Sequence, residues 1–107
     1  MDTKVSIDEA RLWVKKFCDD RGWDDPHTAK DLAIGMVTEG CELLEIFRFV
    51  PRDGEPDVLK KKREDIADEL ADTFYFLLRF SERFGFDLSD ALKKKLVKNA
   101  DKYPAKA

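Results

Sequence analysis

The sequence has few histidines and cysteines, the residues that build di-iron and redox sites, and few glycines and prolines. It contains one histidine, two cysteines, five glycines and four prolines among 107 residues. Cys18 and Cys41 fit no close metal-binding or redox spacing, so we expect two free thiols. Because His27 is the single histidine, the paired Glu-x-x-His motifs of ferritin-like proteins cannot be formed. The di-iron class is therefore excluded.

Long hydrophobic runs and an excess of positive charge are also missing. The N-terminal segment MDTKVSIDEARLW has no apolar core like that of a signal peptide, and no run is long enough to cross a membrane. The formal net charge is −3, whereas proteins that bind nucleic acid usually carry a basic excess or a basic face. We therefore expect a cytoplasmic protein that binds neither membranes nor nucleic acid.

What the sequence does contain is typical of a small helical protein. Hydrophobic residues make up 43% of the chain and charged residues 40%, with eight phenylalanines, and no strand-like alternation persists. A length of 107 residues predicts a single domain, 1–107, with only a modest core, so we expect it to form an oligomer. The predicted fold class is all-α, a four-helix arrangement.

Caps and apolar spacing predict where the four helices lie. Ser6 can cap the first helix, with Glu9 completing a capping box, and Gly85 can end the third in a left-handed conformation. The residues around Pro51, Gly54 and Pro56 predict a loop between the second and third helices. The predicted helices run from 6 to 18, from 27 or 28 to 49, from 60 to 83, and from 87 or 89 to 102.

Two pairs of carboxylates give the strongest functional signal. Glu39 and Glu42 lie three positions apart in the second predicted helix, as do Glu69 and Asp72 in the third, so each pair shares a helix face. Glu39 falls in the middle of an apolar stripe, where an ionised side chain needs a partner. If the two helices pack antiparallel, four acids converge, and their mutual repulsion favours a bound cation. Oxygen ligands suit Mg²⁺ or Mn²⁺, so the sequence predicts a magnesium site.

A basic stretch near the C-terminus supplies a counterpart to the acids. Lys95, Asn99 and Lys102 share a face of the last predicted helix and could present two ammonium groups and an amide to a phosphate chain. The alternative is an exposed lysine face that favours a helix C-terminus.

Together and in order, these motifs resemble the MazG-like nucleotide pyrophosphohydrolases. The resemblance rests on EGCELLEIF, EDIADELADTFYFLL and GFDLSDALKKKLVKNADKYP, and RGWDDPHTAKDL is similar to the small dCTP pyrophosphatase branch. The family pattern is Glu-Glu-x-x-Glu followed by Glu-x-x-Asp, and Thr38 takes the first position here, as a non-acidic residue does in that branch. The remaining acids and the C-terminal motif are matched by Glu39, Glu42, Glu69, Asp72, Lys95, Asn99, Lys102, Tyr103 and Pro104.

The resemblance implies an all-α enzyme that cleaves a nucleoside triphosphate to the monophosphate and pyrophosphate. The four acids would hold Mg²⁺, and either Glu39 or Glu42 would position and deprotonate the attacking water. The triphosphate would contact Lys95, Asn99 and Lys102. The nucleobase and sugar would lie near Trp23, His27, Phe49, Phe76 and Tyr103.

The preferred base stays open, with dCTP or a related or modified deoxynucleotide expected. Phe49 stands where a Trp is common, and Phe76 stands where dCTP-preferring relatives carry Tyr, so a hydrogen-bonding hydroxyl is absent. Read from the residues alone, Trp23 could equally be a packing residue and His27 a surface or capping residue.

Two alternatives remain beside this function in nucleotide pool control or house-cleaning. The same chemistry could act on phosphoribosyl-ATP or a noncanonical nucleotide, or the chain could be a non-catalytic helical module that binds nucleotides or protein. Apolar residues spread around the third predicted helix, including Phe74, Leu78 and Phe84, predict a homodimer or homotetramer. The resemblance implies that a neighbouring subunit helps to close the nucleotide pocket.

Overall fold

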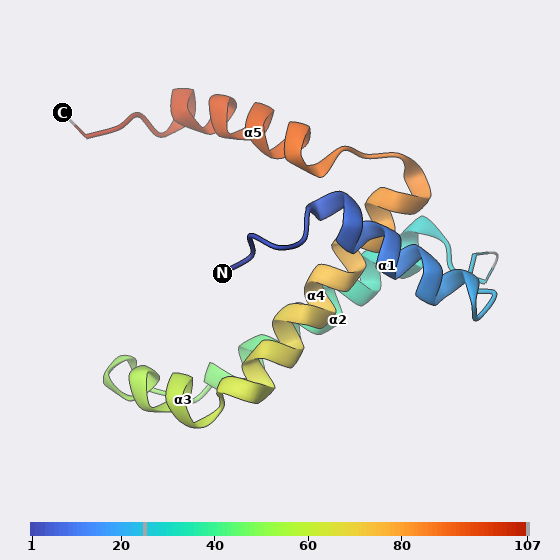
Figure 1. Cartoon of the computed structure of the whole chain (residues 1–107). Coiled ribbons are helices and arrows are strands. Elements are labelled where there is room, and N and C mark those ends of the chain that lie inside the picture. The colour runs from blue at the N-terminus through green and yellow to red at the C-terminus, as the bar shows by residue number, and fades with distance from the viewer. Residues whose placement is uncertain (25, 107) are drawn as a thin grey trace.

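The chain folds into five α-helices and one short 3₁₀ turn, as seen in a computed structural model that describes residues 1–24 and 26–106 (Figure 1). These described residues contain no strand, so the all-α prediction is confirmed. The elements are α1 (Ile7–Asp19), α2 (Ala29–Phe47), η1 (Arg52–Gly54), α3 (Glu55–Lys61), α4 (Arg63–Phe84) and α5 (Leu88–Lys102).

Local side-chain caps start three of the five α-helices, and a glycine ends α4. The Ser6 hydroxyl accepts a hydrogen bond from the Glu9 backbone N–H at 3.0 Å and starts α1. A capping box starts α2: the Thr28 hydroxyl accepts from the Asp31 N–H, and the Asp31 carboxylate accepts from the Thr28 N–H. Gly85 ends α4 in the left-handed region, with φ at 75°. The predicted helix ends at Ser6, at His27 or Thr28 and at Gly85 are confirmed, but Glu9 does not complete a capping box, because its carboxylate accepts from the Ser6 hydroxyl at 3.3 Å.

The segment between α2 and α4 differs from the prediction. A loop was expected at 51–56 and a helix from Lys60, but η1 and α3 occupy most of this stretch, and α4 begins only at Arg63. Pro56 lies in the first turn of α3, where a helix has no use for the N–H that proline lacks. A proline is typical of a loop, but Pro56 lies at the start of a helix in the structure. The described residues therefore form five α-helices instead of the predicted four.

The centre of the molecule is the antiparallel pair α2 and α4, with α1 packed on α4 (Figure 1). Cys18, Leu32 and Leu78 are the buried apolar side chains of the described residues, so the core is small. On α4, the apolar side chains of Leu70 and Phe74 are 54% and 43% exposed.

Helix α5 extends away from the other helices after the turn at Gly85 (Figure 1). It makes no extensive contact with the rest of the described chain. Its apolar side chains Leu92, Leu96 and Val97 are accordingly each more than half exposed. No helix among the described residues is both long and apolar enough to span a membrane.

Candidate metal centre

Three carboxylates from α2 and α4 converge at the middle of the central helix pair. Oxygen atoms of Glu39, Glu69 and Asp72 all lie within 4.8 Å of one another. The antiparallel packing explains this meeting, because Glu69 and Asp72 share a face of α4 that crosses α2 at Glu39. Three of the four predicted ligands are therefore brought together.

The electrostatics of this cluster are unfavourable without a cation. The Oε2 atoms of Glu39 and Glu69 are buried and have no hydrogen-bond partner among the described residues. Burial and then the neighbouring Glu42 carboxylate raise the pKa of Glu39 to about 7. The same two causes raise the pKa of Glu69. The fold keeps acids where it also makes their ionisation costly.

A hard divalent cation fits this donor set. The cluster offers carboxylate oxygens alone, which Mg²⁺ and Mn²⁺ prefer over the softer metals. The two unpartnered buried oxygens are the atoms that such an ion would satisfy. The arrangement is thus compatible with a divalent metal.

Glu42 lies beside this centre. Its side chain is exposed and borders a groove of about 540 Å³, and Glu69 lines the same groove. Glu42 is near enough to raise the pKa of both Glu39 and Glu69, although it is not one of the three converging acids. Its role as a ligand or base stays a prediction.

The predicted phosphate-binding residues lie elsewhere in the chain. Lys95, Asn99 and Lys102 project from α5, which extends away from the helix pair that carries the acids (Figure 1). Within one chain the structure therefore does not bring these residues to the metal centre.

The predicted nucleobase residues lie in separate parts of the structure. Trp23 and His27 lie together in the loop before α2, with ring centroids 5.6 Å apart. Phe76 packs over Gly35, where the absent side chain leaves room for the ring. Phe49 is 86% exposed beyond the other end of α2, roughly 27 Å from that loop at 1.5 Å per helical residue. Tyr103 caps the exposed end of α5.

Gly35 and Arg79 were missed at the sequence level. Arg79 is only 1% exposed, although it stands in the apolar run YFLLRF of α4. A lone charge within such a run was the available signal, because charged residues are seldom buried unless they are paired. Nothing in the sequence indicated that Gly35 faces a ring.

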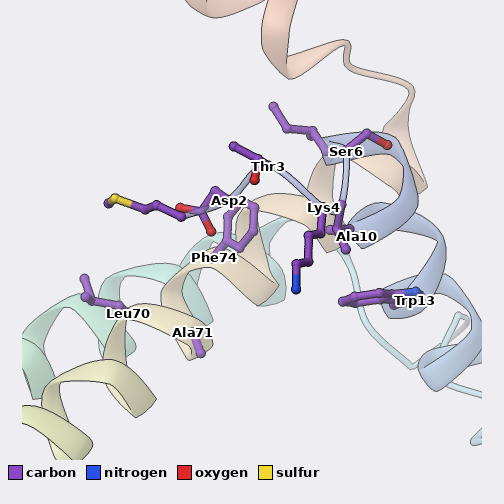
Figure 2. Close-up of a pocket in the computed structure, with 12 residues that line it drawn as sticks. Asp2, Thr3, Lys4, Ser6, Ala10, Trp13, Leu70, Ala71 and Phe74 are labelled. Atoms are coloured by element: carbon purple, nitrogen blue, oxygen red, sulfur yellow. The ribbon is translucent and has the colours of Figure 1, made fainter.

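A wide apolar hollow lies on another side of α4. It has a volume of about 890 Å³ between the N-terminal segment, α1 and α4, and Trp13, Leu70 and Phe74 line it (Figure 2). Leu70 and Phe74 project from α4 well away from Glu69 and Asp72, as their spacing of about 100° per residue requires. This hollow is therefore separate from the acidic cluster.

Fold and site together define a class of all-α proteins with a carboxylate centre between two antiparallel helices. The model of the MazG-like family matches residues 39–107, which include all four predicted acids. The chain belongs to the MazG-like family.

Proteins that are similar in sequence and in structure agree with this family assignment. The chain is 29% identical over 103 residues to dCTP pyrophosphatase 1 of Homo sapiens, covering 94% of this chain and 60% of the relative. It is 28% identical over 105 residues to the protein of that name in Bos taurus, covering 95% of this chain and 62% of the relative. The chain thus spans about 60% of the length of these curated relatives. A solved pyrophosphatase of Archaeoglobus fulgidus is 33% identical, with a TM-score of 0.89 and coverage of 98% of both chains.

Proposed function

We propose that this protein is a Mg²⁺-dependent pyrophosphohydrolase that converts nucleoside triphosphates to monophosphates and pyrophosphate. The observation that carries the proposal is the cluster of Glu39, Glu69 and Asp72 with its unpartnered buried oxygens. Membership of the MazG-like family and similarity to proteins named dCTP pyrophosphatase 1 support the nucleotide as substrate. A role in nucleotide pool control or house-cleaning follows from this activity.

The chemistry assigned to the acids follows from their environment. When bound, Mg²⁺ would neutralise the negative charge that builds on the departing pyrophosphate. Glu39 or Glu42 orients the attacking water and accepts its proton. Glu39 belongs to the acidic cluster and Glu42 lies beside it, so either carboxylate is placed to act on a water at the centre. Glu39, Glu69 and Asp72 would hold the cation.

The proposed nucleoside end of the site lies toward the loop before α2. Phe76 stands one turn from Asp72 on α4, and Trp23 and His27 lie further toward the C-terminal end of that helix. Aromatic rings in this position offer stacking surfaces for a base. We propose dCTP, or a related or modified deoxynucleotide, as the preferred substrate.

A second subunit completes the proposed site. The radius of gyration is 16.7 Å, against roughly 13 Å for a compact chain of this length. Helix α5 exposes its apolar residues and the predicted phosphate ligands Lys95 and Lys102, and the third predicted ligand, Asn99, is half-buried. We propose a homodimer or homotetramer in which α5 of one subunit carries these ligands to the acids of another. Phe49 would reach the base only from a neighbouring subunit as well.

The test is turnover by the purified protein with Mg²⁺ and a panel of canonical and modified nucleoside triphosphates, with products resolved by ion exchange. We expect monophosphate and pyrophosphate from one class of base. Glu39→Gln and Glu42→Gln should each lower the rate at least about 100-fold, since removal of a catalytic acid–base group costs that much. Glu64→Gln is the matched control, because Glu64 is an exposed acid of α4 that does not line the groove beside the metal centre. No Mg²⁺-dependent turnover of any nucleotide would refute the proposal.

A further inference from the structure

Two arginines of α4 hold the loop that carries Trp23 and His27. Arg79 Nη2 donates hydrogen bonds to Asp24 Oδ1 at 2.6 Å and to the Trp23 carbonyl oxygen at 3.3 Å. One turn further along, Arg83 Nη1 donates to the His27 carbonyl oxygen. The two arginines lie four positions apart and so share a helix face. Both described ends of this loop are therefore fastened to α4.

The burial of Arg79 exceeds what stability of α4 requires. Its side chain is 1% exposed, and its Nε has no hydrogen-bond partner among the described residues. Glu82, one turn away on the same helix and 10% exposed, already neutralises the guanidinium through a bond of 2.7 Å. Asp24 is 59% exposed, so its charge is solvated and does not need Arg79 as a partner. The second carboxylate adds a connection across 55 residues of sequence.

The anchored loop lies in line with the metal centre. Arg79 follows Asp72 by seven positions, which returns to the same face of α4 within about 20°. Two helical turns separate the two residues by roughly 10 Å. Phe76 lies between them on the same side of α4 and packs over Gly35. A nucleotide with its phosphates at Asp72 would therefore extend its base toward the loop.

The Trp23 ring is also supported by aromatic side chains outside the loop. The Trp23 ring lies edge-on to His27 at 5.6 Å and to Phe17 of α1 at 5.7 Å. Phe17 in turn contacts Tyr75 of α4 at 6.2 Å. A loop that is held at its backbone and supported at its rings loses little further freedom when a ligand binds.

We propose that Arg79 is a positioning residue for base recognition, which acts by holding the Trp23–His27 loop in place through Asp24. This inference rests on the proposed function and assigns a role within its site. Releasing the loop should weaken binding of the correct base and leave the phosphate chemistry intact. The expected signature is a raised KM with little change in kcat.

Asp24→Ala is the variant that tests this role. Arg79→Ala would leave Glu82 with an unpaired, nearly buried charge and risks loss of the fold. Asp24→Ala removes only the exposed partner, and Arg79 keeps Glu82. Asp20→Ala is the matched control, because Asp20 is 55% exposed and pairs with Lys16 at 2.8 Å on α1. Both variants lose one carboxylate and one ion pair.

The first readout needs no substrate. In a Trp13→Phe background Trp23 is the one tryptophan left, so its fluorescence reports on the loop. We expect Asp24→Ala to raise the acrylamide quenching constant of Trp23 about 2-fold, as a loosened segment becomes accessible. Asp20→Ala should leave the constant unchanged. Equal quenching in the two variants would show that Asp24 does not hold the loop and would overturn the inference.

The second readout is steady-state kinetics on the nucleotide panel. We expect Asp24→Ala to raise KM for the preferred nucleotide about 10-fold, to reduce discrimination between bases by a similar factor and to keep kcat within about 2-fold. An unchanged KM and base preference in an Asp24→Ala variant with a loosened loop would overturn the inference while turnover by the wild type upholds the proposed function. Absence of turnover by the wild type would refute the proposed function, and the role of Arg79 with it.

Discussion

At the scale of the single residue, Glu39 is an acid in a place that is unfavourable for an ionised side chain. Its position on the inner side of α2 removes one carboxylate oxygen from water, and Glu69 and Asp72 surround it with like charge. Apolar residues at these positions would make the helix pair more stable, because unpaired buried charge is costly. The acids therefore do not hold the fold together, and their arrangement is compatible with a divalent metal.

Neutralising one acid should separate binding from stability. We expect Glu39→Gln to raise the melting temperature of the metal-free protein, because repulsion with Glu69 and Asp72 is relieved. The same change should weaken Mg²⁺ binding at least about 10-fold, as measured by calorimetric titration, since loss of a ligating group costs at least as much as loss of its supporting partners. Glu64→Gln, which removes an exposed acid of α4 outside the groove, should change neither quantity. Tighter Mg²⁺ binding by Glu39→Gln would contradict the assignment.

The raised pKa of Glu39 gives a pH dependence with a definite sign. Its value is about 7 in the folded protein, against 4.5 for an ordinary glutamate, so the folded state holds the proton over that interval while the unfolded state releases it. The metal-free protein should thus lose stability as pH rises from about 4.5 to about 7. Thermal melts in EDTA measure this slope.

Glu39→Gln serves as the control for that slope. The part of the pH dependence due to Glu39 is the difference between wild type and variant, and Mg²⁺ should diminish it because the cation binds the ionised form. A slope that is identical in the two proteins would show that Glu39 titrates in its ordinary range.

At the scale of the element, the register of α2 against α4 organises the site. Gly35 faces Phe76, and one turn further along α2, Glu39 faces Glu69 and Asp72. The antiparallel register therefore fixes the place of a ring and of the carboxylates at the same time. A shift of either helix would separate the acids.

Gly35 should be a position of α2 at which one added methyl group disturbs the packing against α4. A Cβ at Gly35 would approach Phe76 Cδ1 to 2.8 Å, so Gly35→Ala should lower the free energy of unfolding by about 1–3 kcal/mol. Gly40→Ala is the control on the same helix, where a Cβ has no atom within 4 Å and should raise it by about 0.5–1 kcal/mol. Urea denaturation measures both. A stabilising Gly35→Ala would contradict the packing, and Phe76→Leu should recover part of the lost stability.

The sequence predicted the elements that local chemistry determines. The caps at Ser6 and Thr28 and the left-handed stop at Gly85 each depend on a few neighbouring residues, so they could be recognised one by one. Three of the four acids could be placed together because helical spacing and one antiparallel contact suffice.

The features that sequence analysis missed depend on contacts between distant segments. The ring over Gly35 and the Arg79–Asp24 pair join residues more than forty positions apart, and spacing carries no signal for either. Pro56 was misassigned because proline is common both in loops and in the first turn of a helix. The spread of apolar residues around α4 predicted more than one neighbour for this helix, and Leu70 and Phe74 are about half exposed in the single chain.

At the scale of the whole molecule, the single chain leaves much apolar surface uncovered. Trp13, Phe74 and Phe86 are each more than two-fifths exposed, and α5 has no extensive contact with the other helices in the part of the chain that the structure describes. Uncovered surface of this kind is typical of chains that bury it in an assembly. The proposed oligomer accounts for the exposed apolar surface and the distant phosphate ligands together.

Mixed oligomers should show whether the site is shared between subunits. Glu69→Gln removes an acid and Lys95→Ala removes a proposed phosphate ligand, so each variant alone should be inactive or nearly so. When the two are refolded together as a dimer, about one quarter of the sites regain both residues if α5 acts on the partner, since half of random dimers are mixed and each has one intact site.

The same experiment can exclude a shared site. If α5 acted on its own chain, every site in the mixture would lack one residue and no activity would return. Light scattering provides the accompanying measurement, and a mass of 12.4 kDa at micromolar concentration would contradict the oligomer.

The most direct test of the central claim is hydrolysis of the preferred nucleotide in ¹⁸O-water with Mg²⁺, followed by mass spectrometry of the products. Attack by water on the α phosphorus, positioned by the acids of α2 and α4, predicts one ¹⁸O atom in the monophosphate and none in the pyrophosphate. Label in the pyrophosphate, or release of a diphosphate and inorganic phosphate, would contradict the proposed reaction.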